Sequence, residues 1–187
     1  METNPTLSSG HFETLLGYWK GLRDAQGGVP KRASLNPVEI REILPYVFLI
    51  ERRAPDDLLV RLAGTALDEV SPMPVTGANY LDFCPDEHRP FVMDAVRAVV
   101  EVPCGHRFSR EVTFQNGRSH IITTLALPMI SETGEARYLI GVTVTREDVL
   151  AADKTPAAYS EVKFLYSEFV DLGFGLPEKT ILDDLDL

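Results

Sequence analysis

The sequence predicts an α+β fold: a five-stranded antiparallel sheet with a helical crossover on one face, plus a flanking helix near each end of the chain. Three observations lead to this class. Residues 104–146 contain three strand-like runs in succession, joined by polar turns. Two further strand-like runs, at 46–51 and 58–62, come earlier in the chain. Short helical segments and one longer helix separate the two groups.

The run at 107–114 has the alternation of a half-buried strand, because successive side chains of a strand point to opposite faces. One face carries four of these side chains: Phe108, Arg110, Val112 and Phe114. The turn that follows contains Asn116-Gly117, a pair that accepts the positive φ of a tight hairpin. The third run, at 138–144, is almost wholly apolar and is typical of a central strand covered on both faces.

Residues 1–28 predict an amphipathic helix from about 11 to 25 that ends at Gly27-Gly28. Its apolar residues recur at helical spacing: Phe12, Leu15, Leu16, Trp19 and Leu22. We expect this stripe to be a lid on the sheet or a surface for a homodimer or a partner protein. Packing on its own domain is the alternative.

The domain body, 29–148, begins with a short helix that Asn36 caps and Pro37 opens. The runs at 46–51 and 58–62 then form a hairpin. The longest helix of the body covers about 85–102 and turns an apolar face to the sheet: Val92, Ala95, Val96 and Val99.

Residues 149–187 predict a linker, a helix that begins near Thr155-Pro156 and ends at Gly173, and an acidic tail. The stripe of this helix falls at 3.6-residue spacing: Val162, Leu165, Tyr166, Phe169 and Val170.

Composition excludes several classes of function. The 18 basic and 28 acidic residues give a net charge of −10, which repels nucleic-acid phosphates and anionic membranes. No apolar run approaches the roughly 20 residues of a membrane-spanning helix, and the N-terminus lacks the features of a secretory signal. Cys84 and Cys104 form neither a disulfide framework nor a metal-ligand spacing. We expect a reduced, cytoplasmic protein.

A set of short motifs carries a resemblance to a known family. They are Trp19–Arg23, Val29–Arg32, Leu35–Pro37, Ile43–Glu51, Val60–Thr65, Thr76-Gly77 and Tyr80–Asp82. Together they resemble the PAS domain family, and within it short bacterial proteins with a single PAS domain, from about Leu15 to Arg146. The resemblance implies a sensory or regulatory domain. It further implies that such a domain binds a small ligand between helix and sheet, or that it is a ligand-free module for dimerisation and partner docking.

Arg110 is the first candidate for a ligand contact, because it shares a strand face with Phe108. A guanidinium inside a cavity requires an anionic partner, and a ligand carboxylate provides one in bidentate geometry. A protein carboxylate, or a face that is only partly buried, is the alternative. His120 and Thr124 on the next strand offer further polar contacts, although a lone strand histidine is more often structural.

The resemblance also points to Tyr80, His88 and Phe91 in the crossover, where PAS ligands are held. His88 is similar in place to the helical histidine of haem-binding PAS proteins, but it precedes Pro90. Cys84 lies where the flavin-binding branch keeps a reactive cysteine, yet that branch has an arginine next, whereas Pro85 follows here. No cofactor and no metal are therefore predicted.

No nucleophile elbow, phosphate loop or zinc-protease signature is present, so no catalytic residue is predicted. We expect a regulatory protein that binds a small, optionally anionic, ligand and signals by touching another protein. A ligand-free interaction module is the alternative. A small enzyme acting through Arg110 and His120 is a third option.

Overall fold

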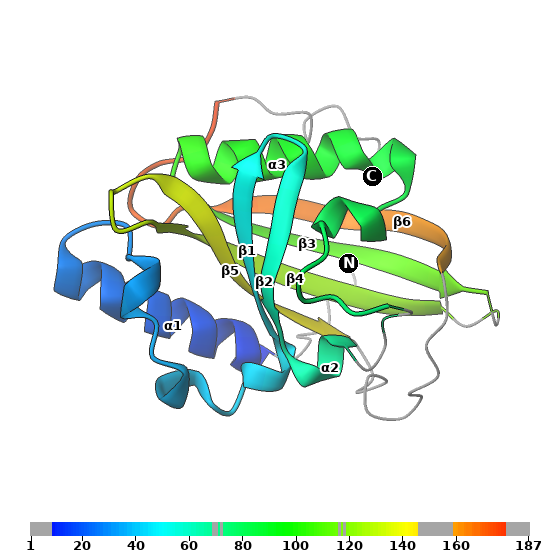
Figure 1. The fold of residues 1–187 in the computed structure, drawn as a ribbon, viewed down its shortest axis with the longest axis horizontal. Helices are drawn as coiled ribbons and strands as arrows, with labels where there is room; N and C mark the ends of the chain where they lie inside the picture. Colours follow the sequence, from blue (N-terminus) through cyan, green and yellow to red (C-terminus); the bar gives the residue numbers. More distant parts are fainter. Residues whose placement is uncertain are drawn as a thin grey trace, which may run out of the picture.

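The structure is a computed structural model that describes residues 9–68, 71, 73–115, 117, 119–145 and 159–178. Its centre is a six-stranded antiparallel sheet in the order β2-β1-β5-β4-β3-β6 (Figure 1). The strands are β1 Val47–Ala54, β2 Asp57–Ala63, β3 Gly105–Phe114, β4 Ser119–Ile130, β5 Ala136–Thr145 and β6 Tyr159–Val170. The α-helices are α1 Ser9–Gln26, α2 Thr65–Asp68 and α3 Arg89–Glu101. Short 3-10 turns lie at Arg32–Ser34, Pro37–Ile40, Leu44–Tyr46, Tyr80–Phe83 and Asp86–His88.

The predicted α+β class and its strand pairings are confirmed. β1 and β2 form a hairpin, and β3, β4 and β5 form the meander. β1 also pairs with β5, which joins the two groups into one sheet. Gly117, in the turn after β3, has a φ of 80°, as the Asn-Gly signal requires. The Asn36 side chain accepts from the Val38 amide, although the helix that it caps is a single 3-10 turn.

The predicted C-terminal helix is wrong, because Tyr159–Val170 form β6 and pair antiparallel along β3. The sheet therefore has six strands among the described residues instead of the predicted five. The predicted helical stripe included Leu165 among its buried residues. In the structure Leu165 is the extra residue of a β-bulge opposite β3 and is 37% exposed, whereas its neighbour Phe164 is buried. Aromatic and β-branched side chains favour a strand, and pairing satisfies the backbone groups along the edge of β3.

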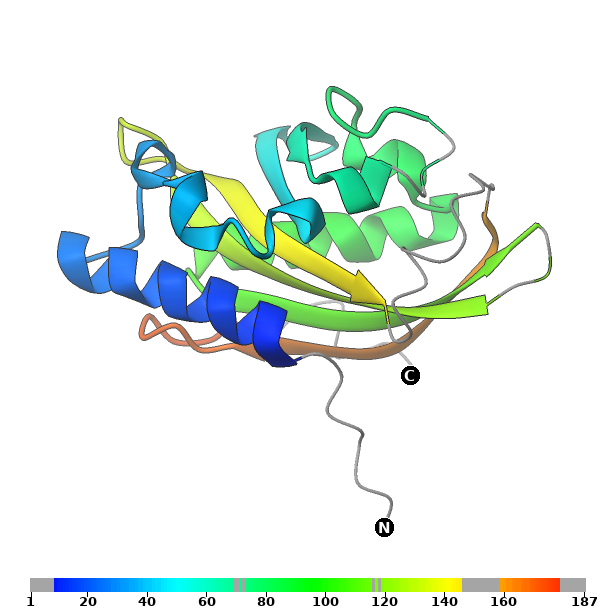
Figure 2. The same ribbon diagram turned by 90° about the horizontal axis from the view of Figure 1, so that it is seen from below.

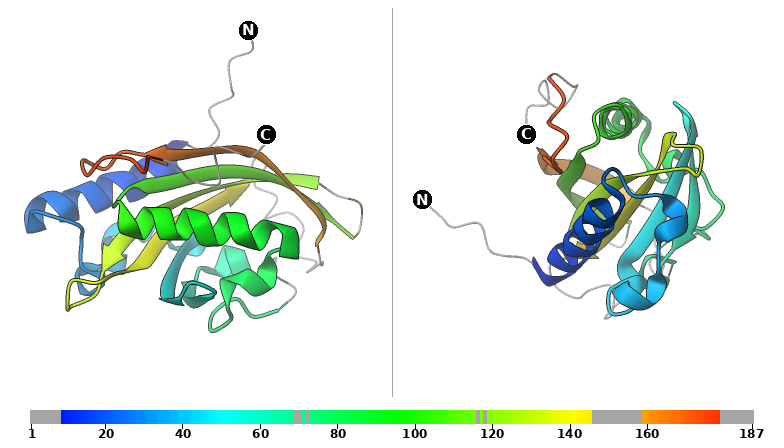
Figure 3. Two further views of the ribbon diagram at one scale, coloured as in Figure 1. Left: turned by 90° about the horizontal axis from the view of Figure 1, so that it is seen from above. Right: turned by 90° about the vertical axis from the view of Figure 1, so that its left-hand side faces the viewer.

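α1 and α3 cover opposite faces of the sheet (Figures 2 and 3). Phe12, Leu15 and Trp19 of α1 are buried against one face, and the Trp19 indole donates to the Pro128 carbonyl at 2.8 Å. In this structure these three residues, predicted for a dimer or partner contact, are core residues of their own chain. Leu16 and Leu22 from the same stripe are only partly buried.

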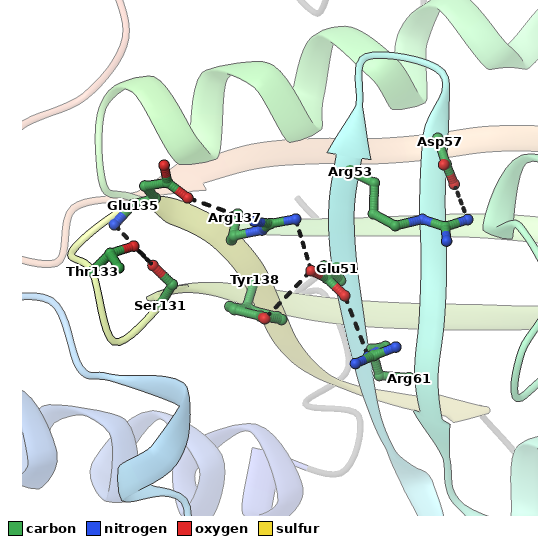
Figure 4. A network of polar contacts seen from close by, with 9 residues as sticks. All are labelled: Glu51, Arg53, Asp57, Arg61, Ser131, Thr133, Glu135, Arg137 and Tyr138. Atoms are coloured by element: carbon green, nitrogen blue, oxygen red, sulfur yellow. Dashed lines mark hydrogen bonds and ion pairs between the residues drawn. The ribbon is translucent and has the colours of Figure 1, made fainter.

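A buried carboxylate joins β2, β1 and β5 near the start of β5 (Figure 4). Glu51 of β1 is 8% exposed and lies 2.8 Å from the Arg137 guanidinium of β5 and 3.3 Å from that of Arg61 of β2. The Tyr138 hydroxyl donates to the same carboxylate at 3.4 Å. Because its charge is matched within the chain, this cluster is a structural one.

Gly64, directly after β2, packs closely on the 3-10 turn at Leu44–Tyr46 that precedes β1. A Cβ at this position would overlap the carbonyl oxygens of Leu44 and Pro45, which are backbone atoms and move little. We expect Gly64→Ala to lower the free energy of unfolding by about 2 kcal/mol in urea denaturation. Gly21→Ala is the control: nothing lies within 4 Å of its added methyl group, so it should be neutral or stabilise α1 by up to about 1 kcal/mol. Equal effects would contradict the packing.

The register of β6 makes opposite predictions for two neighbouring residues. Phe164 is 9% exposed and packs with Phe91 and Phe108, so Phe164→Ala should lower the free energy of unfolding by about 3 kcal/mol or more. Leu165→Ala should cost less than about 1 kcal/mol, because its side chain faces solvent. A larger loss for Leu165→Ala would instead support the helix.

Candidate functional site

A cavity of about 140 Å³ lies between α3 and the sheet. α3 contributes an apolar wall: Phe91, Val92, Ala95, Val96 and Val99. The sheet contributes the opposite wall, mainly from Phe48, Ile50, Phe108, Ile122, Ala126 and Leu139. The polar side chains at its surface are few: Ser71, Tyr80, His106, Arg110, Thr124, Thr143 and Thr145. An apolar cavity with a few polar groups is the usual form of a small-molecule site.

Five of the seven residues predicted to contact a ligand line this cavity: Tyr80, Phe91, Phe108, Arg110 and Thr124. His120 is not among its lining residues, because the register of β3 and β4 places it opposite Val112, beyond Arg110 along the strand. Its ring instead lies 5.5 Å from that of Phe114. His88 precedes α3 and packs edge-on against Phe164 at 4.9 Å, also outside the lining.

Arg110 brings a positive charge to the cavity, on the face that the alternation of β3 predicts. Its Nη1 donates to the Tyr80 hydroxyl at 3.3 Å. Its guanidinium carbon lies 5.7 Å from the centre of the Phe108 ring. Arg110 and Tyr80 therefore place a guanidinium and a hydroxyl side by side, next to an aromatic ring.

His106 is a cavity residue that the sequence analysis missed. It is 4% exposed, and its Nε2 lies 2.9 Å from the Ser167 hydroxyl of β6. Burial lowers the pKa of His106 to about 4, so its ring is neutral at physiological pH. The alternation of the strand could have identified it, because His106 lies two residues before Phe108 and therefore on the same strand face as Phe108 and Arg110.

The centre of the sheet wall is built from small residues. Ala126 of β4 pairs with Gly141 of β5 and with His106 of β3. The Phe48 ring lies directly over Gly141, where a Cβ would overlap it. In the next row the hydroxyls of Thr124 and Thr143 lie 3.0 Å apart and hydrogen-bond each other.

Cys84 does not lie where it could react with a molecule in the cavity. Cys84 is buried outside the lining, its thiol donates to the Tyr80 carbonyl at 3.6 Å, and burial raises the pKa of the thiol. The described residues contain no group of three or more His, Cys, Asp or Glu side chains placed to hold a metal ion. Within the same residues, no helix has the length and apolar character to cross a membrane.

A profile of the PAS domain family (PAS_5) matches residues 8–144, and the chain belongs to this family. The resemblance expected from the sequence is thus confirmed, and the chain has a PAS-type sensory domain fold. No curated protein matches it.

Solved structures with a similar fold include three receptors. An RNA-binding Light-Oxygen-Voltage receptor has 17% identity and a TM-score of 0.45, over 68% of this chain and 39% of its own. The blue-light photoreceptor Vivid in its photo-excited state has 18% identity and a TM-score of 0.44, over 70% of this chain and 93% of its own. The VqmA dimer of Vibrio cholerae has 14% identity and a TM-score of 0.46, over 60% of this chain and 51% of its own. The family match alone carries the assignment.

The buried histidine predicts a pH dependence of stability. Because the pKa of His106 is about 4 in the folded chain and about 6.5 in an unfolded one, the unfolded state binds more protons between these values. Stability therefore falls as the pH falls from about 6.5 to 4, by on the order of 3 kcal/mol from this group. Urea denaturation of wild type and His106→Gln across this range should show the wild type losing more. Parallel pH profiles would contradict a buried neutral imidazole.

Proposed function

We propose that this chain is a cytoplasmic PAS sensor that binds a small anionic ligand between α3 and the sheet and signals through contact with another protein. The observation that carries the proposal is the Arg110 guanidinium in the wall of an otherwise apolar cavity of about 140 Å³. A charge in such surroundings attracts an anion more strongly than a surface charge does.

Arg110 and Tyr80 suit a carboxylate. A guanidinium has several donors in a planar fork, and the Nη1 of Arg110 donates to the Tyr80 hydroxyl at 3.3 Å. A carboxylate is the kind of anion that a guanidinium binds in bidentate geometry, and a tyrosine hydroxyl can also donate to it. Thr124 and Thr143 add hydroxyls to the same wall.

The arrangement of the sheet supports an output through α1. Ala126 of β4 lines the cavity, while its neighbours Leu125 and Leu127 pack beneath α1. A ligand that binds one arrangement of β4 better than another would therefore shift the position of α1. We propose a homodimer or a protein partner on this side of the molecule, with the partly buried Leu16 and Leu22 at the contact.

A ligand-free PAS interaction module is the second candidate, and the small size of the cavity favours it. The third option, an enzyme using Arg110 and His120, has less support. Arg110 lines the cavity, whereas His120 lies outside it beside Phe114. We propose no catalytic step.

Substitution of two arginines on opposite faces of β3 can test whether Arg110 contacts the proposed ligand. Arg110→Gln removes the cavity charge, while Arg107→Gln is a matched control, since Arg107 packs on Phe12 and lies 3.9 Å from Glu168. Native mass spectrometry beside a denatured sample should show a small molecule on wild type and Arg107→Gln. Binding to Arg110→Gln should be at least about tenfold weaker, because a hydrogen bond to a charged group contributes about 1.5–3 kcal/mol.

The same experiment can contradict the proposal. A molecule retained equally by Arg110→Gln would remove Arg110 from the site. Absence of any bound molecule, together with no thermal stabilisation by a panel of small acids, would favour the ligand-free module.

A further inference from the structure

We infer that two copies of this chain form a homodimer by pairing antiparallel along the outer edge of β6. The inference goes beyond the proposed function, because it assigns the homodimer a surface of its own and leaves the α1 side to the partner protein. It does not depend on a ligand. It draws on three features: the outer edge of β6, the charges along this strand, and the β-bulge at Leu165.

β6 is the last strand of the sheet and runs along the rim of the molecule (Figure 3). One of its edges pairs with β3. At its other edge, none of the residues that the structure describes pairs with it or forms a backbone hydrogen bond to it. A strand of 12 residues with such an edge presents a row of N–H and C=O groups that a strand of another chain can satisfy.

Charged side chains on the α1 face of β3 and β6 form two rows of opposite polarity. In one row Arg107 of β3 is paired with Glu168 of β6, and the two side chains lie 3.9 Å apart. In the other row Glu111 of β3 is paired with Lys163 of β6. The charge at the outer edge is therefore negative in one row and positive in the other. Because a twofold axis exchanges the rows of two antiparallel copies, Lys163 of each copy can lie opposite Glu168 of the other.

The β-bulge makes this pairing compatible with strand geometry. Residues directly opposite each other in an antiparallel pair lie on the same face of the sheet. Lys163 and Glu168 are an odd number of positions apart, so a regular strand would place them on opposite faces. The extra residue at Leu165 brings them to the same face, because both are paired with residues of one face of β3, Glu111 and Arg107.

The charges favour one register over its neighbours. With Lys163 opposite Glu168 of the second copy, a row of four alternating charges crosses the interface: Glu111 and Lys163 of one copy, then Glu168 and Arg107 of the other. The twofold axis repeats this row. A shift of two residues in one direction would place Glu161 opposite Glu168, two like charges, and a shift in the other direction would place Val170 opposite Lys163.

The α3 face of β6 adds an apolar contact in the same register. Val162 lies opposite Phe169 of the second copy, and both side chains are only half-buried in the single chain. Lysines and bulges often protect edge strands from pairing. A strand protected from its own copy would meet it with like charges, whereas β6 meets it with opposite ones.

Sedimentation velocity of the purified full chain over a range of protein concentrations can test the dimer. Wild type should show a monomer–dimer equilibrium. Lys163→Glu and Glu168→Lys should each weaken dimerisation by about tenfold or more, because each places like charges opposite each other twice in the dimer. Glu161→Lys is the matched control. It reverses a charge on the same face of β6, but opposite Val170, and should dimerise at least as tightly as wild type.

Two combinations of these substitutions keep the test independent of folding defects. The double variant Lys163→Glu/Glu168→Lys exchanges the two charges and should dimerise again. An equimolar mixture of the two single variants should form a heterodimer, because one chain is then negative and the other positive at both positions. Circular dichroism and urea denaturation confirm that each variant is folded.

The outcomes separate this inference from the proposed function. A wild type that stays monomeric at every concentration overturns the β6 dimer and leaves the sensor with a partner protein only. A dimer that resists both single substitutions also overturns it, and loss of that dimer in Leu16→Glu would place the contact on the α1 side. If the single variants are monomeric and neither the double variant nor the mixture dimerises, the inferred register is wrong. None of these outcomes changes the ligand binding tested with Arg110→Gln.

Discussion

Burial of β4 on both faces is the constraint on which the rest of the fold depends. Leu125, Leu127 and Met129 face α1 and are almost fully buried, while Thr124 and Ala126 face α3. A strand with two buried faces needs a cover on each side. This explains why an N-terminal helix packs on a PAS sheet here, and why its Trp19 side chain is fixed to the β4 backbone at Pro128.

The cavity wall contains two basic residues that tolerate burial in different ways. His106 loses its charge, because desolvation disfavours the imidazolium, and it keeps one hydrogen bond to Ser167. Arg110 cannot lose its charge under ordinary conditions. It lies instead beside an aromatic ring and the hydroxyl of Tyr80. The cavity wall therefore contains one basic side chain that is neutral and one that keeps its charge.

Period-two alternation and turn chemistry are local, and they predicted the strands of the body and the cavity position of Arg110 from the sequence. Pairing register is not local, so the sequence could not show that His120 lies opposite Val112 and outside the cavity. β6 was misassigned for a related reason. One extra residue at Leu165 shifts the alternation midway, and the resulting spacing imitates a helix. What favours a strand over a helix at 159–170 is the edge of β3 with which this segment pairs, and that edge exists only in the folded sheet.

β6 and the residues directly after it are part of the packed core. The family match ends at residue 144, yet β6 supplies Phe164 to the core, and Leu172 after it is fully buried among the residues beneath α1. The Leu172 carbonyl also accepts from Arg23 of that helix at 2.7 Å. A fragment cut at the family boundary would expose the long edge of β3 and loosen the far end of α1. The packed core therefore continues past the residues that the family profile matches, at least as far as Leu172.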